Sequence, residues 1–92
     1  MMTKAVIHLI DDDDGVRQSL AFSLTTAGLA VRSYDSAIAF LAALSELQPG
    51  CVVTDVRMPG MDGLELQRRL NEQAVNMPVI VITGHADVRL AV

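Results

Sequence analysis

The sequence has few cysteines and aromatic residues: one cysteine, no tryptophan, two phenylalanines and one tyrosine in 92 residues. A single cysteine, Cys51, cannot form a disulfide within the chain, which excludes a disulfide-stabilised secreted domain and predicts a reducing compartment. No apolar run approaches the roughly 18 residues that a membrane-spanning helix needs. The start, Met1-Met2-Thr3-Lys4, lacks the pattern of a signal peptide. We therefore expect a cytoplasmic protein without a membrane segment.

Basic residues are also scarce, with seven Lys and Arg against eleven Asp and Glu, for a net charge of −4. No stripe of basic residues is present, so we expect no nucleic-acid binding by this segment itself. The acidic residues are unevenly placed, because four of them form the run Asp11–Asp14 directly after an apolar segment. One interpretation is a solvated acidic loop, which is what charge runs usually form. We expect Asp13 and Asp14 to face solvent, with Asp14 also a candidate N-cap of the following helix.

The hydrophobic fraction, 51%, is high enough for a folded core. Segments 5–10, 51–54 and 78–83 are short and rich in Val and Ile, as is typical of strands buried on both faces of a parallel sheet. A weaker alternating segment, 30–34, suits an edge strand. Amphipathic helical periodicity fills the intervals between these strands. The alternation predicts an α/β fold in which helices cover both faces of a parallel sheet.

Carboxylates follow two of the predicted strands. Asp11 and Asp12 follow segment 5–10, and Asp55 follows segment 51–54. The carboxyl ends of parallel strands share one edge, where such folds bind ligands. Converging carboxylates repel one another, and Mg²⁺ relieves this because it prefers oxygen ligands. A carboxylate beside Mg²⁺ can attack phosphorus to form an aspartyl phosphate. Pro59 and Gly63 constrain the loop after Asp55, because proline fixes φ and glycine permits a left-handed turn.

Three motifs occur in order along the chain: Leu9-Ile10-Asp11-Asp12-Asp13, Thr54-Asp55-Val56-Arg57-Met58-Pro59-Gly60-Met61-Asp62-Gly63 and Val81-Ile82-Thr83-Gly84. Together they resemble the response-regulator receiver family of the CheY-like superfamily, over the whole chain. The run from Thr83 to Val88 resembles the FixJ-type nitrogen-fixation branch, whose members usually carry a LuxR-like helix-turn-helix domain. The resemblance implies one receiver domain, residues 1–92, with a flavodoxin-like doubly wound parallel sheet of strand order 2-1-3-4.

The resemblance also implies a role for individual residues in two-component signal transduction. Asp55 would accept a phosphoryl group from a sensor histidine kinase, and Thr83 would contact that group and act as the switch. Asp12 would bind Mg²⁺ directly, Asp11 would bind it through water, and the backbone carbonyl of Arg57 would complete the protein's ligands. The protein would then be a phosphoacceptor that controls an output such as transcription, and not a stand-alone enzyme. From the residues alone, Thr83 is a strand-end residue that satisfies backbone groups.

Measured against the family pattern, the chain is incomplete at its C-terminus. A fifth strand and fifth helix, about thirty residues by average element lengths, are not present. The strand-five lysine of the family is not matched either, because Lys4 is the only lysine. We therefore expect a low yield of phosphorylation. We also expect the apolar edge at 78–83 to be covered in a homodimer whose contact includes residues 78–92.

Two alternative functions are open. A truncated receiver that no longer switches could act only as a protein-binding or dimerisation module. A haloacid-dehalogenase-like phosphatase also uses a strand-end aspartate, but it expects a second Asp at the position of Arg57. The histidines are not expected to be ligands: His8 lies within a strand and should be packed, and His85 lies in a loop.

Overall fold

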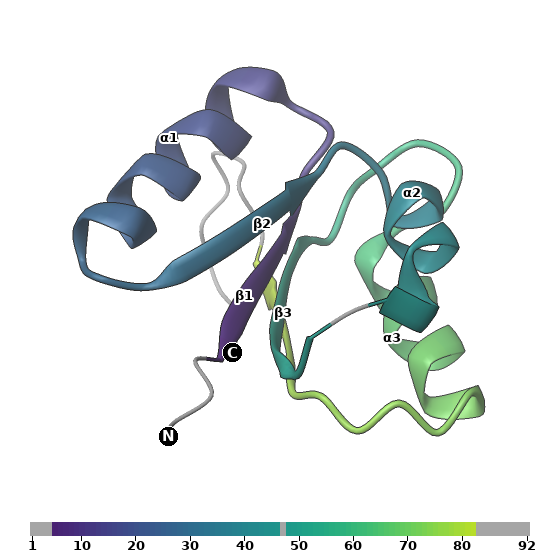
Figure 1. The fold of residues 1–92 in the computed structure, drawn as a ribbon. Helices are drawn as coiled ribbons and strands as arrows, with labels where there is room; N and C mark the ends of the chain where they lie inside the picture. Colours follow the sequence, from purple (N-terminus) through teal and green to yellow (C-terminus); the bar gives the residue numbers. More distant parts are fainter. Residues whose placement is uncertain (1–4, 47, 83–92) are drawn as a thin grey trace.

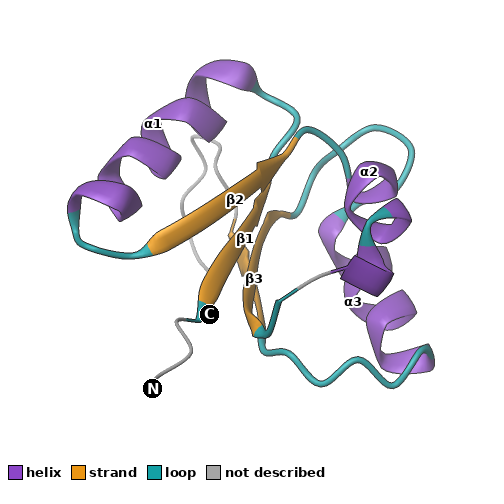
Figure 2. Ribbon diagram, in the orientation of Figure 1, coloured by secondary structure: helices purple, strands orange, loops and turns teal. Residues whose placement is uncertain are grey.

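The computed structural model describes residues 5–46 and 48–82, which form a four-stranded parallel sheet with helices on both faces (Figures 1 and 2). The strands are β1 (Val6–Ile10), β2 (Ala30–Tyr34), β3 (Gly50–Asp55) and β4 (Val79–Ile82). Their order is β2-β1-β3-β4, and each neighbouring pair is parallel. This confirms the predicted doubly wound sheet, its strand order 2-1-3-4 and the edge position of β2.

The helices fall in the predicted intervals. They are α1 (Asp14–Thr26), α2 (Ala37–Ala42), a short 3₁₀ turn (Leu44–Glu46) and α3 (Gly63–Glu72). Helix α1 lies on one face of the sheet, and α2 and α3 lie on the other (Figure 1). No helix among the described residues is long and apolar enough to cross a membrane.

Side-chain caps fix where each helix begins. The carboxylate of Asp13 accepts the backbone N–H of Val16 at 3.0 Å, so Asp13 is the N-cap of α1. Our prediction that Asp14 caps this helix is wrong by one residue, because Asp14 is already the first helical residue. Ser36 and Asp62 cap α2 and α3 in the same way. Since such caps satisfy N–H groups that have no partner in the helix, they set the bounds of these elements.

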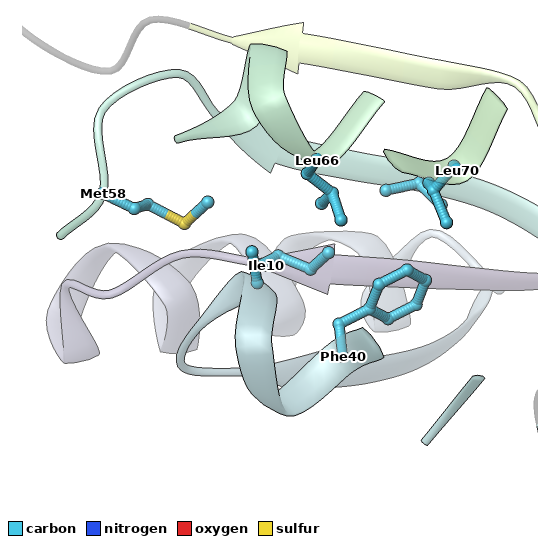
Figure 3. Packing of buried hydrophobic residues seen from close by; sticks show 7 residues of the cluster. Ile10, Phe40, Met58, Leu66 and Leu70 are labelled. Carbon is cyan, nitrogen blue, oxygen red and sulfur yellow. The ribbon is translucent and has the colours of Figure 1, made fainter. Parts of the chain in front are cut away.

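The hydrophobic core lies between the sheet and the pair α2 and α3. Ile10 from β1, Phe40 from α2 and Leu66 and Leu70 from α3 point toward one another, and Met58 closes one end (Figure 3). Each of these side chains is at most 8% exposed. By contrast, none of the thirteen residues of α1 is buried. The two faces of the sheet are therefore packed unequally.

His8 is a packed histidine, as predicted. It is fully buried in the middle of β1, and its Nε2 lies 2.9 Å from the backbone carbonyl oxygen of Gln48. The carbonyl can only accept, so Nε2 carries the proton. The rings of Tyr34 and Phe40 lie 6.4 Å and 5.7 Å from the His8 ring, centroid to centroid. Burial and this one hydrogen bond hold the histidine as a packing residue.

Candidate functional site

The carboxyl ends of β1 and β3 bring three aspartates together. These strands are neighbours with Ile10 paired to Thr54, so the residues that follow, Asp11 and Asp55, emerge side by side. One carboxylate oxygen from each of Asp11, Asp12 and Asp55 lies within 4.8 Å of the other two. Asp11 is 2% exposed and Asp55 is 5% exposed, whereas Asp12 is open to solvent. The predicted convergence of these three carboxylates is present in the structure.

Asp11 is held in place on three sides. Its N–H donates to the carbonyl of Tyr34 at 3.1 Å, which extends the β1–β2 ladder by one bond. Its carboxylate accepts the N–H of Asp13 at 2.9 Å, and its own carbonyl accepts from the guanidinium of Arg17 at 2.8 Å. The carboxylate of a strand-end residue is thereby fixed by both the strand and the loop that follows.

The loop after Asp55 is shaped by two glycines. Gly60 has a φ of +84° and is the left-handed residue of this loop. The left-handed turn that the sequence suggested at Gly63 therefore lies three residues earlier. Gly63 has a different reason to be glycine. A Cβ there would lie 2.5 Å from the backbone oxygen of Asp55, so a side chain would push α3 away from the end of β3. The Asp55 carboxylate also accepts the N–H of Arg57 at 3.4 Å, a long hydrogen bond.

The surroundings of Asp11 change the pKa of its carboxylate. Burial raises the pKa of Asp11 above its ordinary value, and the negative charges of Asp55, Asp12 and Asp13 raise it further. The hydrogen bond from the Asp13 N–H opposes this rise because it favours the charged form. A cation held among these oxygens would offset the repulsion, and the all-oxygen ligand set suits a hard ion.

Asp11→Asn is expected to stabilise the metal-free protein at neutral pH. Because the pKa of Asp11 is raised in the folded state, its contribution to stability is present at acidic pH and is lost as pH rises through that pKa. Asparagine stays neutral and keeps an oxygen for the Asp13 N–H. We expect the unfolding midpoint at pH 7 with EDTA to rise, and each kcal/mol gained in a domain of this size raises it by about 4 to 8 °C.

Thermal unfolding followed by circular dichroism from pH 3.5 to 7.5 measures this. The gain of Asp11→Asn over wild type should shrink toward pH 3.5. Asp35→Asn removes an exposed carboxylate and is the matched control, with no pH-dependent gain expected. A gain for Asp11→Asn that is equal at both ends of the pH range would contradict the explanation from ionisation.

The group of three carboxylates does not contain every predicted site residue. Thr83 and His85 lie outside the described residues. Arg57 is exposed and follows Asp55 by two residues, and its predicted role involves only its backbone carbonyl. The sequence reasoning missed Arg17, which contacts both the carbonyl of Asp11 and the carboxylate of Asp14. Its spacing of three residues from Asp14 is the signal that could have pointed to it.

Comparison of the sequence with known protein families identifies the family of this chain. The family profile described as "Response regulator receiver domain" matches residues 7–92. The chain belongs to the response regulator receiver family. Receiver domains are signalling domains, so this one is the receiver of a two-component response regulator.

Two relatives of this receiver have names that describe them as transcriptional regulators. It is 60% identical over 86 residues, 94% of its length, to "Transcriptional regulatory protein FixJ" of Azorhizobium caulinodans. It is 53% identical over its full length to the protein of the same name from Bradyrhizobium diazoefficiens. The receiver chain spans 41% and 45% of the lengths of these two relatives.

A solved structure shows the same receiver fold. The crystal structure of FixJ-N superposes on 95% of this chain with a TM-score of 0.86 and 50% sequence identity, and the match covers 70% of the FixJ-N chain. The resemblance to FixJ-type receivers predicted from the motifs is therefore confirmed.

Proposed function

We propose that this receiver accepts a phosphoryl group from a sensor histidine kinase on Asp55, with Mg²⁺ held beside it. Asp11, Asp12, Asp55 and the backbone carbonyl of Arg57 would hold the ion. The observation that supports this most is the grouping of three carboxylate oxygens within 4.8 Å of one another at the ends of adjacent strands. Family membership supports it as well.

The ligand set fits Mg²⁺ better than a transition metal. All three side chains offer carboxylate oxygens, and no described His or Cys takes part in the group. Two of these carboxylates are buried, and the pKa of Asp11 is raised by burial and by its neighbours, so the group benefits from a cation. When bound, Mg²⁺ supplies positive charge that offsets the repulsion between these carboxylates and an incoming phosphoryl group.

The residues of the chain then have distinct tasks. One carboxylate oxygen of Asp55 bonds to phosphorus while the P–N bond to the kinase histidine breaks. The imidazole leaves with the electron pair of that bond and takes a proton from solvent. Strand pairing and the N–H of Arg57 hold Asp55 at the carboxyl end of β3, which supports its proposed role as the nucleophile. Thr83 is proposed to bond a phosphoryl oxygen of the product and to carry the switch.

The names of the relatives suggest a wider role for this receiver. We propose one receiver domain over residues 1–92, located in the cytoplasm, which acts as a phosphoacceptor and not as a stand-alone enzyme. In a full-length regulator it would control transcription, as the names of the FixJ relatives suggest. The acidic balance of the chain, −4, supports an output that does not involve nucleic-acid binding by this segment.

Incubation with phosphoramidate or acetyl phosphate tests this function directly. With Mg²⁺, intact mass spectrometry should show the addition of a single phosphoryl group, and EDTA should prevent it. Peptide mapping should place the group on Asp55, and it should be stable in acid and labile in base. A phosphoryl group on His8, His85 or a hydroxyl would overturn the assignment.

We further propose that the protein forms a homodimer through residues 78–92. Strand β4 lies at the edge of the described sheet, and Ile80 on it is 52% exposed. An apolar strand edge favours pairing with another chain. This edge is also what favours the second candidate function, a dimerisation module without phosphorylation. A dimer that takes up no phosphoryl group under the conditions above would support that alternative.

Ile80→Lys is expected to shift the protein from dimer to monomer. The charged side chain opposes pairing at the edge, whereas Ile38→Lys alters a similarly exposed isoleucine on α2, away from β4, and should leave the dimer intact. Analytical ultracentrifugation at 5 to 200 μM measures both, and the unfolding midpoint of wild type should rise with concentration. A wild type that is folded and monomeric throughout this range would rule out the dimer.

A further inference from the structure

Arg17 joins two parts of the acidic loop that carries Asp12. It lies in the first turn of α1, and its side chain is 15% exposed although its ion-pair partner Asp14 is 78% exposed. One guanidinium nitrogen donates to the backbone carbonyl of Asp11 at 2.8 Å, and another donates to the carboxylate of Asp14 at 2.5 Å. The two bonds therefore span the loop from residue 11 to residue 14.

These contacts restrict the loop more than an ordinary surface ion pair does. A guanidinium is planar and its donors keep a fixed arrangement, so bonding to both residues at once sets the distance and direction between them. The carbonyl of Asp11 is the first backbone acceptor after β1 ends at Ile10, and the Arg17 guanidinium donates to it. The side chain of Arg17 thus determines how the chain turns from β1 into α1.

Asp12 depends on that turn. The other carboxylates of the run each accept a hydrogen bond from a described residue. Among the described residues no donor bonds to the Asp12 carboxylate, which nevertheless lies with those of Asp11 and Asp55, so among the described contacts it is the backbone of the loop that directs it. We infer that Arg17 is a positioning residue for the metal site, which it serves by holding the loop that carries Asp12. This inference rests on the proposed function.

Two possible effects of Arg17 on Mg²⁺ binding have opposite signs, which makes the inference testable. As a cation near the site, Arg17 would repel Mg²⁺, so its removal would tighten binding. As a positioning residue, it preorganises Asp12, so its removal would weaken binding. Outer residues that orient metal ligands typically change metal affinity by 10- to 100-fold. The sign of the change in Kd therefore separates the two effects.

The experiment compares Mg²⁺ affinity, by isothermal titration calorimetry, in wild type, Arg17→Met, Arg17→Lys and Arg32→Met. Arg32 is exposed on β2, so Arg32→Met is the matched control that makes the same change in net charge. We expect Kd to rise about tenfold in Arg17→Met and to change less than about twofold in Arg32→Met. Arg17→Lys should recover part of the affinity, because lysine keeps the charge and can donate to the Asp11 carbonyl.

The rate of labelling by phosphoramidate gives a second readout. In Arg17→Met the Mg²⁺ concentration for half-maximal labelling should rise about tenfold, as the Kd does, while the rate at saturating Mg²⁺ stays within about twofold of wild type. General damage to the fold would lower both. If Arg17→Met does not fold, Arg17→Lys decides alone, because one ammonium group cannot hold both oxygens as the guanidinium does. A Kd at least about threefold higher supports the inference, and an unchanged Kd overturns it.

The outcomes also separate this inference from the proposed function. A lower or unchanged Kd in folded Arg17→Met overturns only the role of Arg17. A wild type that binds no Mg²⁺ overturns both the inference and the proposed function.

Discussion

Asp55→Asn is expected to abolish phosphoryl uptake, with a loss of at least about a hundredfold in the labelling rate. The amide oxygen of asparagine is neutral and a poor nucleophile, and no other described carboxylate has the same position at the end of β3. Asparagine has nearly the same shape and can still accept the N–H of Arg57. Its effect should therefore be on chemistry and not on folding. Intact mass spectrometry over a time course with phosphoramidate and Mg²⁺ measures it.

Asp62→Asn is the matched control for this experiment. It also changes an aspartate to asparagine near the site, but Asp62 caps α3, and asparagine caps helices equally well. We expect its labelling rate to stay within about twofold of wild type. Labelling of Asp55→Asn at the wild-type rate would show that the nucleophile lies elsewhere.

Asp12→Asn and Asp55→Asn are expected to raise the Kd for Mg²⁺ at least about tenfold, a cost of about 1.4 kcal/mol or more. Each change removes one of three negative charges and replaces a carboxylate with a weaker oxygen ligand. Isothermal titration calorimetry with Mg²⁺, repeated with Mn²⁺, measures the loss.

Asp13→Asn controls for the general acidity of the loop. Asp13 belongs to the same run but caps α1 through its carboxylate and is not in the group of three. Its substitution should change Kd by less than about twofold, because asparagine preserves the cap. Equal affinities in wild type, Asp12→Asn and Asp55→Asn would argue against a metal at these carboxylates.

Much of this site could be predicted because it follows from the sheet. Runs of Val and Ile mark buried parallel strands, and the strand order places the end of β1 next to the end of β3. Asp11 and Asp55 must then emerge together, whatever the details of the loops.

The parts that could not be predicted depend on local backbone conformation. In a run of four aspartates, side-chain chemistry is the same at every position, so only the backbone decides that Asp13 and not Asp14 is the cap. Gly60 and Gly63 are both plausible left-handed residues, and their different roles follow from how closely α3 approaches β3. The contact of Arg17 with a backbone carbonyl leaves no periodic signal in the sequence.

The unequal packing of the two faces of the sheet has a consequence for amide hydrogen exchange. Helix α1 has no buried residue, whereas α3 contributes Leu66 and Leu70 to the core. The amides of α1 should therefore exchange through a local opening of low free energy, well before β1 and β3 open. That opening breaks the bond from Arg17 to Asp11 and releases the loop at the site. A ligand that requires the closed loop then slows exchange in α1, a helix that does not itself supply Asp11, Asp12 or Asp55.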